Sequence, residues 1–76
     1  MSPHALPLLI ADVELIGGPA DGQIVRGLYH PRSKAAVIEQ PIEGRPGRHA
    51  IYDTADATQG KAHYLYDVDA PLPLHP

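Results

Sequence analysis

A glycine-rich segment, Gly17-Gly18-Pro19-Ala20-Asp21-Gly22, is the first place where this sequence could do chemistry. Glycine-rich loops bind phosphate when free backbone N–H groups and the start of a helix point at the anion. Here the GK[ST] ending and the G-x-G-x-x-G spacing are missing, a strand pattern follows, and Asp21 would place a negative charge beside the phosphate. The alternative is a β-turn, with Pro19 at its second position and Gly22 at a positive φ. The sequence favours the turn.

Two pairs of carboxylates, Asp12 with Glu14 and Asp67 with Asp69, each share one face of a predicted strand, because side chains alternate with a period of two. If the first and last strands were neighbours, the four acids could hold Ca²⁺ or carry out paired-acid chemistry. In the alternative, the acids face water because the intervening apolar residues form the inward face. That inward set is Val13, Leu15, Tyr66 and Val68, and it favours the second interpretation.

His49 and His63 lie in one predicted hairpin and could form a two-histidine metal clip. No third ligand accompanies them, since the remaining histidines lie in proline-rich segments, so surface histidines are expected. The chain has no cysteine and no Ser-His-Asp order. The sequence therefore predicts no enzyme, no cofactor and no metal.

The aromatic residues are four tyrosines, with no Phe and no Trp. Tyr52, Tyr64 and Tyr66 could stack on bases or on a protein partner if they share one face of the sheet. Tyrosines in such a chain more often supply the large rings of the core, with their hydroxyls at its rim.

The elements that must position these residues are short strands, recognised by alternation and by turn residues. The third strand has an alternative, because Ser33 could cap a two-turn helix ending at Pro41, but Val37-Ile38 before a proline favours extended structure. Strands are predicted over residues 12–16, 23–29, 35–40, 48–53 and 61–69. The expected fold is all-β: a small antiparallel sheet or partly open barrel of about five strands.

The predicted core is small for a chain of 76 residues, which forms one domain at most. No disulfide can reinforce it, so a partner surface or an oligomer would add stability. The candidate core residues are Val13, Leu15, Ile24, Val25, Leu28, Val37, Ile38, Ile42, Ile51, Tyr52, Tyr64, Leu65, Tyr66 and Val68.

Proline-bearing ends flank this β-domain, and we divide the chain into an extended N-terminal arm (1–11), a β-domain (12–69) and an extended C-terminal arm (70–76). The arms carry leucines, which either pack back on their own domain or lie on neighbouring subunits. The longest apolar run near the start is far shorter than the ~20 residues that a bilayer requires, so no membrane partner is expected.

Charge is distributed unevenly along the chain. Residues 26–48 carry five basic side chains against two acids, and the remainder carries Lys61 against seven acids, for an overall charge of −3. Such a dipolar surface suits steered protein association, and five scattered basic residues are a poor footprint for nucleic acid. The alternative is ordinary solvated charge. The candidate partner-binding residues are Leu6, Leu8, Leu9, Arg26, Arg32, Lys34, Arg45, Arg48, Leu72 and Leu74.

The stretch LIGGPADGQIV, with the later Tyr64-Leu65-Tyr66, resembles short GGPxDG-containing proteins of tailed bacteriophages, prophages and some bacteria, most of them uncharacterised. The match covers residues 12–29 and 61–69. The resemblance implies a phage context and no catalytic residue. The expected function is a non-enzymatic virion accessory that docks on virion subunits or on itself. The alternative is a small inhibitor of a host defence or regulatory protein, and the expected location is the virion or the host cytoplasm.

Overall fold

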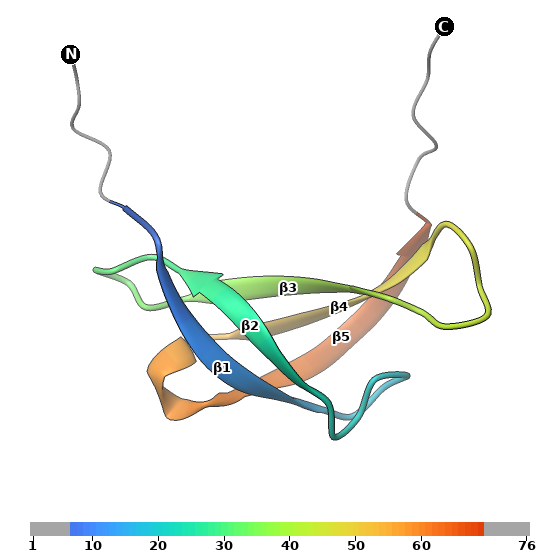
Figure 1. Cartoon of the computed structure of the whole chain (residues 1–76), viewed down its shortest axis with the longest axis horizontal. Coiled ribbons are helices and arrows are strands. Elements are labelled where there is room, and N and C mark those ends of the chain that lie inside the picture. Colours follow the sequence, from blue (N-terminus) through green and yellow to red (C-terminus); the bar gives the residue numbers. More distant parts are fainter. Residues whose placement is uncertain (1–6, 70–76) are drawn as a thin grey trace, which may run out of the picture.

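The computed structural model describes residues 7–69, which form five strands and a single 3₁₀ turn (Figure 1). The elements are β1 (Leu9–Ile16), β2 (Ile24–Tyr29), β3 (Ala36–Pro41), β4 (Arg48–Thr54), η1 (Ala57–Gln59) and β5 (Lys61–Asp69). The predicted all-β class is confirmed, and the ambiguous third segment is a strand. β1 begins at Leu9, so residues 9–11 belong to the sheet and not to an N-terminal arm. The predicted arm residues Leu6, Leu72 and Leu74 lie outside the described residues.

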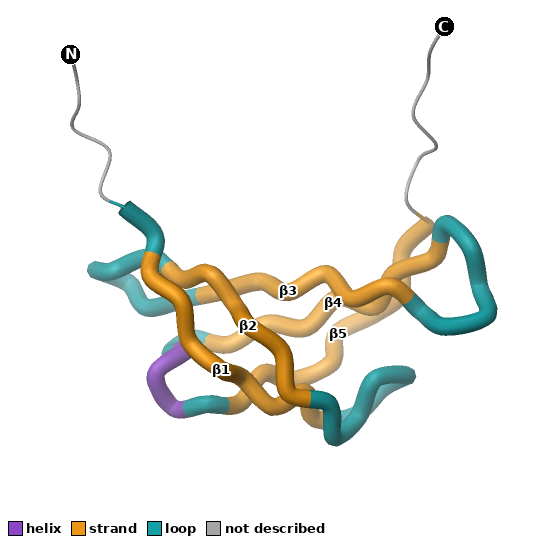
Figure 2. Tube along the Cα trace, in the orientation of Figure 1, coloured by secondary structure: helices purple, strands orange, loops and turns teal. Residues whose placement is uncertain are grey.

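The strands form one sheet in the order β2-β1-β5-β4-β3, which curls until β2 and β3 approach each other (Figure 2). This is the predicted partly open barrel. The sheet is mixed, since β1 and β5 are parallel while the other ladders are antiparallel. The reason is geometric: when five consecutive strands alternate in direction around a circle, the first and the last must run the same way.

The described chain forms no β-ladder between β2 and β3, which are the two edges of the sheet. Side chains make the contacts across this seam. Ile38 of β3 packs against Gly27 of β2, where an added Cβ would lie 3.2 Å from its Cδ1 atom. Near one end of the seam, the Gln40 side-chain amide donates a hydrogen bond to Gln23 Oε1 at 3.2 Å. Glycine at position 27 therefore lets β3 close over β2 without backbone pairing.

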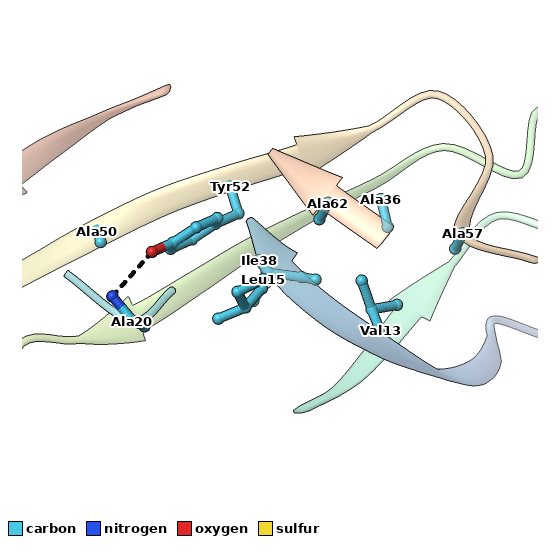
Figure 3. Packing of buried hydrophobic residues seen from close by; sticks show 9 residues of the cluster. All are labelled: Val13, Leu15, Ala20, Ala36, Ile38, Ala50, Tyr52, Ala57 and Ala62. Atoms are coloured by element: carbon cyan, nitrogen blue, oxygen red, sulfur yellow. Dashed lines mark hydrogen bonds between the residues drawn. The ribbon is translucent and has the colours of Figure 1, made fainter. Parts of the chain in front are cut away.

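The core lies inside this curled sheet and combines a few large side chains with many alanines (Figure 3). Val13, Leu15, Ile38 and Tyr52 are buried, as predicted. Val25, Ile42 and Tyr64 are partly buried against them. The alanines that complete the core are Ala20, Ala36, Ala50, Ala57 and Ala62. Five residues predicted for the core are instead exposed: Ile24, Leu28, Val37, Leu65 and Tyr66.

On β2, the strand register explains the error. Val25 lies opposite Val13, which is buried, so Val25 must face inward with it. Alternation then places Gly27 inside and turns Ile24 and Leu28 outward. The inward face of β2 thus contains a glycine, which a search for apolar residues passes over.

On β5, a β-bulge explains the error. Tyr52 pairs with Tyr64 and Ile51 pairs with Tyr66, so Leu65 is an extra residue in the strand. An extra residue reverses which face each following side chain takes. Tyr66 and Val68 therefore share the outer side with Ile51, whereas Asp67 shares the inner side with buried Ala50. The predicted inward face of Tyr66 and Val68 is wrong beyond the bulge.

The glycine-rich segment is a turn that closes one end of the barrel, as predicted. Asp21 N–H donates to Gly18 O at 3.3 Å, with Pro19 at the second position, and Gly22 has a φ of 89°. The Tyr52 hydroxyl donates to Gly17 O at 2.6 Å and accepts from Ala20 N–H at 2.9 Å (Figure 3). The turn is therefore fixed to β4 by a side chain from the core.

Gly18→Ala tests how tightly this turn is packed. Gly18 has a φ of 65°, and a Cβ there would overlap the Tyr64 ring and approach the Tyr52 hydroxyl at 2.9 Å. Gly44→Ala is the matched control, since Gly44 has a φ of 81° and open space around it. We expect the control to lose about 1–2 kcal/mol from the positive φ alone, and Gly18→Ala to lose about 1–3 kcal/mol more from overpacking, measured by urea unfolding. Equal losses would contradict the packing described here.

Tyr52→Phe tests the hydroxyl itself. The substitution keeps the ring but leaves Ala20 N–H without its acceptor and Gly17 O without its donor. Unmet buried polar groups cost about 1–3 kcal/mol, so we expect a loss of that size in the free energy of unfolding. Tyr66→Phe is the control, because Tyr66 is 56% exposed, and it should unfold like the unmodified protein.

Candidate functional site

The glycine turn is occupied by its own hydrogen bonds. Gly17 N–H donates to Asp21 Oδ1 at 2.6 Å, and the N–H groups of Ala20, Asp21 and Gly22 donate to Tyr52 Oη, Gly18 O and Leu15 O. A phosphate loop needs such groups free, and the Asp21 carboxylate adds a negative charge here. The geometry supports a structural corner.

The two carboxylate pairs do not meet, although β1 and β5 are neighbours. Their parallel register places Glu14 opposite Lys61, at the start of β5, while Asp67 and Asp69 lie at its far end. Asp12 lies opposite Arg26, with 4.0 Å between Asp12 Oδ1 and Arg26 Nε. The four acids therefore form no common site.

Asp67 and Asp69 instead hold β4 and β5 together. Arg48 Nη1 lies 2.7 Å from Asp69 Oδ1, and Arg48 Nε lies 3.7 Å from Asp67 Oδ2. The Tyr64 hydroxyl donates to Asp67 Oδ1 at 2.8 Å. This hydrogen bond, together with desolvation and the negative charge of Asp67, raises the pKa of Tyr64 above its usual value. One guanidinium thus bridges two carboxylates, and one of these also accepts a tyrosine hydrogen bond, which is the behaviour of a structural network.

The histidines are separated along β4 and β5. His49 lies opposite Val68, and its Nδ1 atom is 3.9 Å from Glu39 Oε2. His63 lies opposite Asp53, at the other end of the hairpin. Within residues 7–69, no three His, Cys, Asp or Glu side chains are grouped as metal ligands.

A shallow polar hollow of about 490 Å³ lies beside η1. Asp56, one of its acids, caps η1 by accepting from Thr58 N–H at 2.9 Å. Hydrogen bonds from the Thr58 hydroxyl and backbone lower the pKa of Asp56. The carboxylate is therefore engaged in holding the turn. The lining residues are Asp53, Thr54, Ala55, Asp56, Gln59, Lys61 and His63.

The predicted basic region is divided by β3. Arg32 and Lys34 lie in the loop before β3, and Arg45 lies in the loop after it, at the opposite end of that strand (Figure 2). Arg26 lies on the outer face of β2, and Arg48 is engaged by Asp67 and Asp69. β3 thus separates Arg32 and Lys34 from Arg45, and Arg48 is paired with acids, so the basic residues of the described chain form no single positive patch.

Exposed apolar side chains gather in two places on the outer surface. The first, the β5 patch, consists of the exposed Leu65 and Tyr66 with the half-buried Ile51 and Val68, around the bulge. The second, the β1–β2 face, consists of the outward residues Ile10, Asp12, Glu14, Ile24, Arg26 and Leu28. The predicted partner-binding residues Leu8 and Leu9, where β1 begins, are exposed.

Sequence reasoning missed the β5 patch because Leu65 and Tyr66 read as core residues. The only signal for it was that Tyr64-Leu65-Tyr66 offers three large side chains in a row, of which a half-buried strand can hide no more than two.

Comparison with protein-family models, with curated proteins and with solved structures gives no match for this chain. Among residues 7–69, no helix is long and apolar enough to cross a membrane.

Asp67→Asn tests the cause of the Tyr64 shift. Because the folded protein holds the Tyr64 proton more tightly than the unfolded chain, this stabilisation is present below pH 10 and is lost as the pH rises through the folded pKa. We expect Asp67→Asn to lower the pKa of Tyr64 towards 10.0, followed by NMR of the tyrosine ring carbons. Asp69→Asn, which removes a charge that Tyr64 does not contact, should leave it unchanged.

Proposed function

We propose that this protein is a non-enzymatic docking protein of the phage-virion type, which binds a virion subunit through the β5 patch. The single observation that carries the proposal is the bulge at Leu65. It turns large apolar side chains to the outside of a small barrel, where Leu65 is 48% and Tyr66 56% exposed.

The chemistry of the patch supports protein docking. Tyrosine is enriched among the residues that dominate binding energy, since it combines a large apolar ring with a polar hydroxyl. The backbone of the patch is anchored in the core, because Ile51 lies between Ala50 and Tyr52, which are both fully buried. A preformed surface loses little side-chain entropy on binding.

The acid–base groups of the described chain support a binding role in preference to a catalytic one. The side chains whose pKa values are displaced, Tyr64 and Asp56, each have a structural partner next to them. Asp67 accepts a hydrogen bond from the Tyr64 hydroxyl and lies next to the Arg48 guanidinium. Groups held in this way fasten strands and turns together.

The virion setting rests on the resemblance to GGPxDG-containing phage proteins. Its two parts, the glycine turn and the tyrosine-bearing strand, are in contact in the fold, since Gly17 and Gly18 both pack against Tyr64. The two motifs thus form one structural unit. A host-protein inhibitor would use the same kind of surface, and it is the competing assignment that the following experiment separates.

The test uses the phage or prophage that encodes this chain. A strain carrying Leu65→Ser and Tyr66→Ser is compared with one carrying Val37→Ser, which changes a 70% exposed valine outside the patch. We expect the protein in purified virions, by mass spectrometry, to fall at least about tenfold in the first strain, because an interface anchor is worth about 2 kcal/mol or more. The Val37→Ser strain should match the parent.

Two results would overturn the proposal. One is that the protein is absent from virions of the parent strain, while a tagged copy of it captures a single host enzyme from host extract. The other is equal incorporation of the patch variant and the control.

A further inference from the structure

We infer that two copies of this chain associate face to face through the β1–β2 face. This inference concerns a surface that the proposed function does not use, and it stands or falls independently. Its basis is the pairing of residues across β1 and β2, which makes the outer face complementary to itself.

The face has an apolar end and a charged centre. Ile10 lies opposite Leu28, with exposed fractions of 59% and 55%. Asp12 lies opposite Arg26 in the next outward row, and Glu14 lies opposite Ile24, which is 70% exposed, in the row after that. Neighbouring exposed apolar side chains that form a contiguous patch mark interaction surfaces, whereas single scattered ones do not.

Consider a two-fold axis that runs parallel to the strands, above the outer face and midway between β1 and β2. It places each outward β1 residue opposite its β2 pairing partner in the second copy. Ile10 then packs on Leu28 of the second copy, and Leu28 packs on its Ile10. In the charged row, Asp12 faces Arg26 of the second copy, and Arg26 faces its Asp12. Every interaction occurs twice, as a two-fold interface requires.

Charge complementarity favours this second copy as the occupant. Within one copy, the Asp12–Arg26 pair is long, at 4.0 Å, and its side chains are 74% and 81% exposed. An exposed pair of this kind contributes little. In the dimer, each charge gains a second opposite charge and loses water, which strengthens the attraction. The remaining acid, Glu14, has Lys61 as its neighbour on β5.

The small interior also favours association of two copies. Among residues 7–69, the large side chains that are fully buried are Tyr52, Leu15 and Val13. Association through Ile10 and Leu28 would add apolar burial that the monomer lacks, at roughly 25 cal/mol per Å².

The test measures the dissociation constant of the dimer by sedimentation equilibrium on the full chain. Asp12→Arg places two cations opposite each other in the dimer, and we expect it to weaken association at least about tenfold. The double variant Asp12→Arg with Arg26→Asp exchanges the charges and should restore the parent value. Glu43→Arg, with the same change of charge in the loop before β4, is the matched control and should not alter association.

Several outcomes would overturn the inference. They are a monomeric parent protein, a dimer that Asp12→Arg does not weaken, and a double variant that stays as weak as Asp12→Arg while circular dichroism shows both variants folded. The double variant Leu65→Ser with Tyr66→Ser should dimerise normally, because these residues lie outside the β1–β2 face. A failure of virion docking can therefore be told apart from a failure of dimerisation.

Discussion

The Tyr52 hydroxyl is the contact on which the arrangement of this barrel depends. It joins the glycine turn, between β1 and β2, to the centre of β4 through hydrogen bonds of 2.6 and 2.9 Å. The backbone ladder that links the β1–β2 hairpin to the other strands is short, with only three paired positions between β1 and β5. A buried hydroxyl with both a donor and an acceptor partner therefore supplies a second connection between the two parts of the sheet. Glycine at position 18 is required because the Tyr64 ring occupies the space that a side chain would need.

Local chemistry explains which parts of the fold were predictable. Alternation in β1 and β4, and the turn residues Pro19 and Gly22, act within a few positions, so the sequence was enough to predict the strands, the turn and the partly open barrel. The outcome on β5 depends on where one extra residue enters the ladder. Tyr64-Leu65-Tyr66 fits either phase of alternation, and only pairing with Ile51 and Tyr52 decides it.

The candidate site was harder to predict because it depends on contacts between distant segments. The basic residues of 26–48 read as one group along the chain, but β3 carries them to opposite ends of the barrel. The acid pairs were expected to meet if β1 and β5 were neighbours, and the parallel register separates them even though the strands are adjacent. In both cases the composition of the strands was read correctly, while direction and register were set by tertiary pairing.

The two apolar surfaces follow from the size of the barrel. Among residues 7–69, five of the nine buried hydrophobic residues are alanine, and the inner faces of β3, β4 and β5 each contribute one of them. Besides these alanines, the interior holds Tyr52, Leu15, Val13 and Ile38, since small barrels alternate small and large residues to fill their taper. The other large apolar residues, including Ile10, Leu28 and Tyr66, are placed outside by register and by the bulge. The apolar patches on the outside are thus a consequence of how the interior closes, and the same constraint explains both the modest core and the apolar exterior.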